Sequence, residues 1–244
     1  MAYKTKKILV IIPARGDSKR LLGKNIKKIG GKPLISYAIE AAKKSGIVDH
    51  VVVSTDDRKI ARISKRYGAE VPFLRPTELA KDTSPTLPVL QHAVRFYENN
   101  KNFKPDIVVL IQPTSPLVKS EDVNGTVEKM VSAKVNSCFS GTEISQRPEW
   151  MYRMNSMKPE LFIKSDETLK RSQELPRLAI INGSVYSMKY KTLMNDNLVR
   201  DPRSISIYIM PKERSADIDD LFDFEFAEFL LKRQRINERS KNRK

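Results

Sequence analysis

The sequence predicts an α/β fold, a doubly wound and mostly parallel sheet with helices on both faces. Three runs, at residues 8–12, 51–53 and 107–111, are apolar at every position. Strands of that kind are covered on both sides, as in a parallel sheet between helix layers. Amphipathic segments separate the runs, and this alternation of strand and helix is typical of doubly wound domains.

The segments between the runs have helical periodicity. Pro33 is well placed to open the first of them, since proline suits the first turn of a helix. Gly68 ends the second, and the third follows Pro85. We therefore expect helices near residues 34–42, 60–67 and 87–97, further strands at 179–186 and 204–210, and a last helix from about residue 219.

The chain is expected to form one core with a small insertion and a basic tail. Residues 1–140 and 179–231 form the predicted core, whereas residues 141–178 are irregular and rich in apolar side chains. An apolar insertion of this kind is a candidate interface, so we expect a dimerisation arm. Residues 232–244 carry seven Lys or Arg against one acid and are expected to be solvated or frayed.

Composition favours a cytoplasmic, soluble protein. The single cysteine, Cys138, excludes an internal disulfide, fits a reducing compartment and is expected to be a buried structural thiol. No apolar run approaches the roughly 20 residues that span a membrane. The segment before Ile8 is too short and too charged for a signal peptide. No membrane partner is therefore expected.

The formal net charge of +16 suits an enzyme that binds a polyanion such as a nucleoside triphosphate. The sequence has neither zinc-ligand spacing nor an RNP-like aromatic cluster, so nucleic acid is not the favoured partner. A basic nucleotide- or RNA-binding protein on the same scaffold is the non-enzyme alternative.

The loop after the first strand has the composition of a phosphate cradle. Gly16 and Gly23 permit close approach of the backbone, and four cations fall within ten residues. Backbone N–H groups and fixed positive charge together bind phosphates, although an exposed basic turn has the same composition. The four cations are Arg15, Lys19, Arg20 and Lys24.

Polar residues also follow the later strands, where ligands of open α/β sheets gather. For the acids of Ser54–Asp57, helix capping is the favoured role. The segment that begins at Gln112 either binds a polar edge of the substrate or simply forms a turn. In an extended segment, Asp217 and Asp219 point to the same side and form a hard oxygen site for Mg²⁺ or Mn²⁺. Capping of the last helix by Asp219 or Asp220 is the alternative.

Together these segments resemble the N-acylneuraminate cytidylyltransferases, or CMP-sialic acid synthetases, whose fold is nucleotide-diphospho-sugar transferase-like. The resemblance covers about Ile8 to Leu231, and its motifs occur in the family's order. They are Ala14–Asn25, Val53–Asp56, Leu74–Asp82, Gln112–Leu117, Gln173–Pro176 with Asn182–Tyr186, and Asp217–Asp219.

The resemblance implies transfer of CMP from CTP to the anomeric hydroxyl of a nine-carbon 2-keto sugar acid, with release of pyrophosphate. It implies Arg15, Lys24 and Asp217 as the catalytic residues, and the insertion at residues 141–178 favours a homodimer. By the same resemblance, Arg15, Lys19 and Lys24 hold the triphosphate, Asn25, Arg75 and Ser84 surround the cytidine, Gln112, Arg171 and Tyr186 meet the sugar, and Asp217 and Asp219 bind the metal.

Some positions depart from the family's usual pattern. Asp17 places an acid in the phosphate loop, and Leu22 stands where proline is usual. Ser172 stands where many enzymes that use N-acetylneuraminate have arginine, with Arg171 next to it, which leaves room for legionaminate as the substrate. The Asn182–Tyr186 pattern is less like that of the pseudaminate enzymes. 3-Deoxy-manno-octulosonate is a further alternative, although its enzymes usually have a Ser/Thr-Arg-Leu-Pro loop.

Overall fold

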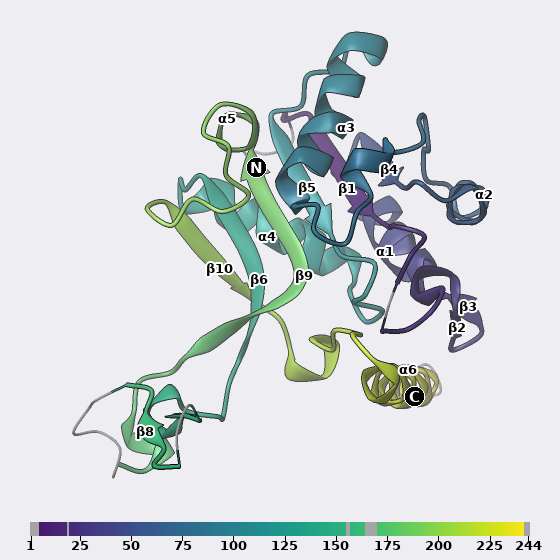
Figure 1. Ribbon diagram of the computed structural model, residues 1–244. Coiled ribbons are helices and arrows are strands. Elements are labelled where there is room, and N and C mark those ends of the chain that lie inside the picture. Colours follow the sequence, from purple (N-terminus) through teal and green to yellow (C-terminus); the bar gives the residue numbers. More distant parts are fainter. Residues whose placement is uncertain (1–4, 19, 155–156, 164–169, 242–244) are drawn as a thin grey trace.

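A six-stranded sheet in the order β10-β6-β9-β5-β1-β4 forms the centre of the molecule (Figure 1). The computed structural model describes residues 5–18, 20–154, 157–163 and 170–241. β9 is antiparallel to both of its neighbours, and the other pairs are parallel. The strands are β1 (Ile8–Pro13), β4 (His50–Ser54), β5 (Ile107–Ile111), β6 (Ser137–Glu143), β9 (Ala179–Lys189) and β10 (Ile205–Ile209).

The three apolar runs form β1, β4 and β5, as predicted, and the doubly wound, mostly parallel fold is confirmed. Alternate side chains of these strands enter two separate hydrophobic clusters, one on each face of the sheet. Five helices cover the faces: α1 (Leu34–Lys43), α2 (Arg58–Arg66) and α4 (Ser120–Ser132) pack on one, and α3 (Thr86–Lys101) and α5 (Tyr190–Met194) pack on the other.

Small elements connect the layers. A short hairpin follows the phosphate loop, and a second lies in the insertion, which projects away from the sheet (Figure 1). The hairpins are β2 (Lys28–Ile29) with β3 (Lys32–Pro33), and β7 (Tyr152–Arg153) with β8 (Glu160–Leu161). The 3₁₀ turns are η1 (Lys24–Ile26), η2 (Thr77–Leu79), η3 (Pro148–Trp150), η5 (Ser172–Glu174) and η6 (Lys212–Arg214).

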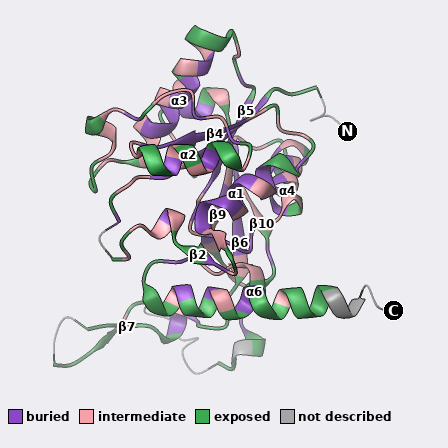
Figure 2. Cartoon of the chain, turned by 90° about the vertical axis from the view of Figure 1, so that its right-hand side faces the viewer, coloured by how far each residue is buried: buried purple, intermediate pink, exposed green. Residues whose placement is uncertain are grey.

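The last helix, α6 (Leu221–Lys241), lies outside both helix layers (Figure 1). It buries Phe224, Ala227 and Leu230 against Leu34 and Leu117. Its described buried residues lie in its first half, at residues 224–231, and residues 232–238 are mostly exposed (Figure 2). This packing attaches the C-terminal part of the chain to the start of α1 and to the segment before α4.

The expectation that the basic tail frays is wrong for residues 232–241, which continue α6 without a break. Lys, Arg, Gln and Glu are good helix formers, and pairs four residues apart add support. Lys232 pairs with Glu228 at 3.3 Å, and Gln234 donates to Glu238 at 3.1 Å. Arg235 reaches further and donates to the Gly30 carbonyl at 2.6 Å. The side chains of residues 232–238 remain mostly exposed, as a charged helix face requires.

Cys138 is buried in β6, as predicted, and burial raises the pKa of its thiol to about 12, which suits a structural role. The sequence pattern missed β6, α4 and α5 because their apolar residues are interrupted by small and polar ones. Gly125 of α4 is one of these: a side chain there would overlap the ring of Tyr208 in β10. Among the described residues, no helix is long and apolar enough to cross a membrane.

Candidate active site

A cavity of about 550 Å³ opens beyond the carboxyl ends of β1 and β5, where the fold predicts a ligand site. Predicted residues from four separate segments meet in it. These are Arg15, Lys24, Asn25, Arg75, Ser84, Gln112 and Asp219. Arg20, one of the four cations of the predicted phosphate-binding loop, also lines the cavity. Other lining residues had no predicted role, among them Ser18, Asp82, Thr86 and Thr114.

The loop after β1 is shaped by short contacts. The Gly16 N–H donates to Asp56 Oδ1 at 3.1 Å, and a side chain at Gly16 would lie 2.8 Å from the Asp57 Cβ atom. Asn25 is buried and donates through Nδ2 to the Arg15 carbonyl at 2.9 Å. Its Oδ1 atom has no hydrogen-bond partner among the described residues. The Arg15 side chain forms an ion pair with Asp82 across the cavity. The predicted phosphate ligand Lys19 lies outside the described residues.

Two further cations of this loop face Asp219. Arg20 Nη1 lies 2.8 Å from Asp219 Oδ2, and Lys24 Nζ lies 3.7 Å from Asp219 Oδ1. The Lys24 side chain is largely buried, and its ammonium donates to the Ile218 carbonyl at 2.6 Å. The loop after β1 and the segment before α6 therefore meet through charged groups at the mouth of the cavity.

Arg75 is held firmly in the wall of the cavity. Its side chain is buried and donates through Nε to Ser54 Oγ at 3.1 Å, and through Nη2 to the Ser54 carbonyl. Burial lowers the pKa of Arg75 to about 10, against the charge of Asp56. Arg75 therefore stays a cation at neutral pH and has a fixed orientation. Ser84, on the same segment, donates to the Glu78 carbonyl at 3.0 Å.

Of the two acids after β4, Asp57 has the helix-capping role expected from the sequence, and Asp56 accepts from Gly16 instead. Asp57 is the N-cap of α2, and its Oδ1 accepts from the N–H groups of Lys59 and Ile60 at 2.5 and 2.9 Å. The N-terminus of α6 is capped in a similar way. Asp220 accepts from the Asp223 N–H at 3.0 Å, and the Asp223 carboxylate accepts from the Asp220 N–H at 3.2 Å. Capping therefore occupies Asp220 and leaves Asp219 facing the cavity.

Asp217 lies beside the cavity, in close contact with β9. A side chain at Gly183, where φ is +77°, would come within 3.2 Å of Asp217 Oδ2. Although Asp217 reaches solvent, loss of hydration at its carboxyl group raises its pKa. A hydrogen bond from Thr114 lowers this pKa, the charge of Asp219 raises it, and the charge of Lys24 lowers it. The two carboxylates are thus near enough to repel each other.

The predicted sugar residues lie at different distances from the cavity. Gln112 lines it, and its N–H donates to the Ser184 carbonyl at 3.0 Å. Tyr186 is half-buried on β9; burial raises its pKa, the charge of Arg200 lowers it, and the charge of Asp217 raises it. Arg171 is exposed in the insertion and is not one of the residues that line the cavity. The structure therefore brings Gln112 and Tyr186, but not Arg171, toward the acidic pair of the same chain.

Comparison with known proteins agrees with this geometry. The cytidylyltransferase family profile matches residues 9–231. The chain belongs to the cytidylyltransferase family. It is a nucleotidyltransferase, as predicted, and the resemblance to the N-acylneuraminate enzymes is confirmed at the level of the family.

Two relatives match this cytidylyltransferase over most of their lengths. The pseudaminic acid cytidylyltransferase of Campylobacter jejuni serotype O:2 is 34% identical over 226 residues, which is 93% of this chain and 97% of the relative. The CMP-N,N'-diacetyllegionaminic acid synthase of Legionella pneumophila is 36% identical over 231 residues, which is 92% of this chain and 96% of the relative. The two identities are similar, so overall identity does not distinguish between these two kinds of enzyme.

A solved structure has the same fold. The CMP:2-keto-3-deoxy-manno-octonic acid synthetase complexed with CTP superposes with a TM-score of 0.68 at 20% identity. The match covers 93% of this chain and 99% of that structure. At this identity the likeness shows a shared fold, which supports the predicted doubly wound architecture.

Several contacts of this cytidylyltransferase site have no signal in the sequence. Arg20 belongs to the predicted phosphate-binding loop and Asp82 to the Leu74–Asp82 motif, but no pattern indicates that they pair with Asp219 and Arg15. Thr114 lies in the Gln112–Leu117 motif, where prolines on either side suggested only a stiff turn. Its contact with Asp217 joins segments about a hundred residues apart, and periodicity carries no signal for such a contact.

Gly183→Ala tests whether the position of Asp217 matters. An added methyl group forces the Asp217 carboxylate to shift by a few tenths of an ångström, and the positive φ adds strain of about 1–2 kcal/mol. We expect turnover to fall about tenfold, because small misplacements at a reacting centre are costly. Gly31→Ala is the matched control, since Gly31 has φ +87° with no neighbour within 4 Å of an added Cβ. Equal turnover in both variants would show that the position of the Asp217 carboxylate does not affect the reaction.

Proposed function

We propose that this enzyme transfers CMP from CTP to the anomeric hydroxyl of a nonulosonic acid, a nine-carbon 2-keto sugar acid, and releases pyrophosphate. One observation carries the proposal. A single cavity places the cations Arg15, Lys24 and Arg75 together with Gln112, and the acidic pair Asp217 and Asp219 borders it. A nucleotidyltransferase needs cations for a triphosphate and acids for its divalent ion, and both are here.

The residues around the acidic pair fit Mg²⁺ or Mn²⁺. Magnesium is usually held by one or two carboxylates and shares its remaining positions with substrate phosphates and water. Among the described residues, no group of three or more His, Cys, Asp or Glu side chains forms a cage for a metal. Asp217 and Asp219 therefore supply the carboxylates, and a bound divalent ion neutralises charge on the triphosphate.

The chain's own residues supply binding and orientation. Arg15, Lys24 and Arg20 face the mouth of the cavity and attract the triphosphate. The ion pairs of Arg15 with Asp82 and of Arg20 with Asp219 reach solvent and are weak enough to be exchanged for phosphate. The largely buried Lys24 stays bonded to the Ile218 carbonyl. Arg75 is fixed too, because it is buried and bonded to Ser54, so it orients the nucleoside. The free Oδ1 atom of Asn25 adds a fixed acceptor close to Arg15.

The sugar acid enters from the side of β9 in this proposal. Gln112 lies at the end of β5, and Tyr186 lies on β9 close enough to Asp217 for that charge to raise its pKa. An anomeric hydroxyl held between these residues faces the α-phosphorus of CTP, which aligns the reactants for displacement of pyrophosphate. The relatives' names point to pseudaminic and legionaminic acids, both nonulosonic.

Pyrophosphate release with CTP, Mg²⁺ and a panel of acids tests the reaction and the substrate. The panel contains legionaminate, pseudaminate, N-acetylneuraminate and 3-deoxy-manno-octulosonate. We expect release with one of the first three at a rate at least about tenfold above that with the octulosonate, and no release when UTP replaces CTP. Rates with each acid are compared as kcat/KM. Absence of release with every acid would refute the proposed reaction.

Asp217→Asn tests the acidic pair. The amide keeps the size of the side chain but removes the charge that holds a divalent ion. We expect turnover at saturating Mg²⁺ to fall on the order of 100-fold, with a raised metal requirement. Asp220→Asn is the matched control, because asparagine also caps helices and Asp220 faces Asp223 instead of the cavity. Unchanged turnover in Asp217→Asn, or an equal loss in the control, would remove Asp217 from the metal site.

We also propose that the insertion packs against a second copy of the chain. Its described part exposes several large apolar side chains, which a solvated surface does not favour. They include Trp150 (42% exposed), Met154 (77%), Met157 (102%) and Phe162 (53%). In such a homodimer, the exposed Arg171 of the insertion lies at the interface between copies, so its predicted sugar contact need not come from its own chain.

Charge substitution tests this interface. We expect Met157→Asp combined with Phe162→Asp to convert a dimer into a monomer in sedimentation velocity experiments, because an interface does not tolerate unpaired buried charges. The control is Phe222→Asp, which alters another exposed aromatic residue, on α6 (76% exposed). A wild-type monomer would refute the dimer, and dissociation by the control alone would place the interface on α6.

A further inference from the structure

The loop between β10 and α6, residues 210–220, carries the acidic pair and is fixed to several other elements. Within the described chain its backbone contacts are few. The Ile218 N–H donates to the Thr114 carbonyl at 3.0 Å, and the Met210 N–H donates to the Gly141 carbonyl at 2.7 Å. Between these two points the loop contains η6 and runs without a strand partner. Side chains therefore have to set the position of its middle.

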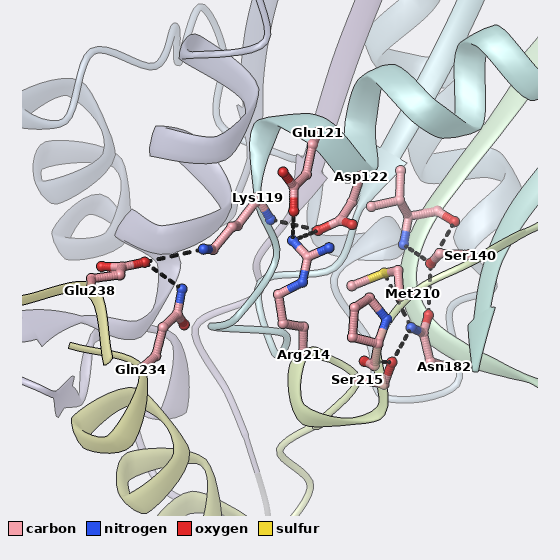
Figure 3. Close-up of polar contacts among 12 residues, drawn as sticks. Lys119, Glu121, Asp122, Ser140, Asn182, Met210, Arg214, Ser215, Gln234 and Glu238 are labelled. Carbon is pink, nitrogen blue, oxygen red and sulfur yellow. Dashed lines mark hydrogen bonds and ion pairs between the residues drawn. The ribbon is translucent and has the colours of Figure 1, made fainter. Parts of the chain in front are cut away.

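Arg214 is the most enclosed charged side chain of this loop (Figure 3). Its Nη1 atom lies 3.0 Å from Asp122 Oδ2 and 2.5 Å from Glu121 Oε1. The Arg214 side chain is 12% exposed, Asp122 is fully buried, and Glu121 is 61% exposed. Solvent weakens the ion pair between Arg214 and Glu121. The ion pair between Arg214 and Asp122 is enclosed, so water does not take the place of either partner. Asp122 is thus the partner that fixes the arginine.

Asp122 is itself unable to move. Its Oδ2 atom also accepts from the Lys119 N–H at 2.8 Å, which caps the N-terminus of α4. Burial raises the pKa of Asp122 to about 6, while the Lys119 N–H and the charge of Arg214 lower it. The arginine therefore stabilises a carboxylate that the site would otherwise disfavour. α4 in turn is pressed against β10, because Gly125 lies directly against the ring of Tyr208.

The next residue of the loop is fixed from a different direction. Ser215 Oγ accepts from Asn182 Nδ2 at 2.9 Å, and Asn182 is buried in β9 (Figure 3). Ser140 of β6 donates to Asn182 Oδ1 at 2.7 Å, so the amide cannot turn. Consecutive residues, Arg214 and Ser215, are thus joined to α4 and to β9. Two attachments in different directions prevent rotation of the loop just before Asp217.

We propose that Arg214 is a positioning residue for the acidic pair: its ion pair with Asp122 holds the loop so that Asp217 and Asp219 lie correctly for a divalent cation. The inference rests on the proposed metal-dependent function of this site. Arg214 touches neither carboxylate of the pair in any described contact and does not line the cavity. It acts by setting where Asp217, three residues further on, approaches Thr114 and Gly183.

Three variants test the role of Arg214. Arg214→Ala removes the ion pair with Asp122, and Arg214→Lys keeps the charge on a single donor nitrogen. Lys212→Ala removes a charge from an exposed position of the same turn. Mn²⁺ binding is measured directly by electron paramagnetic resonance with and without CTP, alongside kcat, KM and thermal unfolding. Removing groups that orient metal ligands typically weakens metal binding by about 10–100-fold.

We expect Arg214→Ala to weaken Mn²⁺ binding at least about tenfold and to lower kcat, with little change in KM for CTP. Arg214→Lys is expected to retain part of the Mn²⁺ affinity and part of kcat. Lys212→Ala is expected to match the wild type in both. A folded Arg214→Ala with wild-type Mn²⁺ affinity would overturn the proposal, and so would loss of thermal stability without loss of metal binding.

The Mn²⁺ measurement also keeps this inference separate from the proposed reaction. If the wild type binds Mn²⁺ but turns over no sugar acid, the reaction is refuted while the comparison of variants still decides the role of Arg214. If Arg214→Ala does not fold, Arg214→Lys and Asp122→Asn are compared with the wild type by the same titration. Equal affinity in all three would overturn the proposal.

Discussion

The site depends on the burial of one residue, Ile218. Its side chain is fully buried in the cluster that joins α6 to the start of α1, so the backbone on either side must pass the edge of the sheet. The N–H of Ile218 donates to the Thr114 carbonyl and its own carbonyl accepts from Lys24. One peptide segment thereby joins the loops that follow β1, β5 and β10. Asp217 and Asp219 flank this buried residue and meet the cations of the first loop for that reason.

Charged groups in the cavity and in the elements that support it fall into two kinds, and burial distinguishes them. The ion pairs Arg15–Asp82 and Arg20–Asp219 are partly exposed, and exposed ion pairs contribute only about 0–1 kcal/mol to the stability of the folded protein. A triphosphate can therefore displace the acids at small cost. Arg75 and the Arg214–Asp122 pair are buried. Removing one member of a buried ion pair leaves the other charge with neither a counter-ion nor water around it. The exposed cations can exchange their acids for phosphate, which suits a substrate that binds and leaves. The buried charged groups keep the geometry of the site fixed.

Much of this arrangement is predictable from the sequence, and the limit has a physical cause. Runs that are apolar at every position predict β1, β4 and β5, and a parallel sheet places the residues after those strands at one edge. Gln112 and Arg15 therefore meet as expected. The pairing of Arg214 with Asp122 is different, because both residues look like ordinary surface charges in the sequence and only the packing of α4 on β10 buries them. The helical tail was missed for a related reason: seven cations suggest repulsion, but contacts such as Arg235 to Gly30 stabilise the helix.

Repulsion between Asp217 and Asp219 explains why the loop needs so many attachments. The charge of Asp219 raises the pKa of Asp217, so the two carboxylates destabilise each other, and the charge of Lys24 offsets part of this effect. A free loop would relieve the repulsion by moving the carboxylates apart. Arg214, Ser215 and Ile218 each fix the loop to a different element, and together they hold the two acids near each other. In the proposed metal site, a bound divalent cation would lower the energy of this pair. Residues that never touch the cation would then contribute to its affinity by holding its two ligands in place.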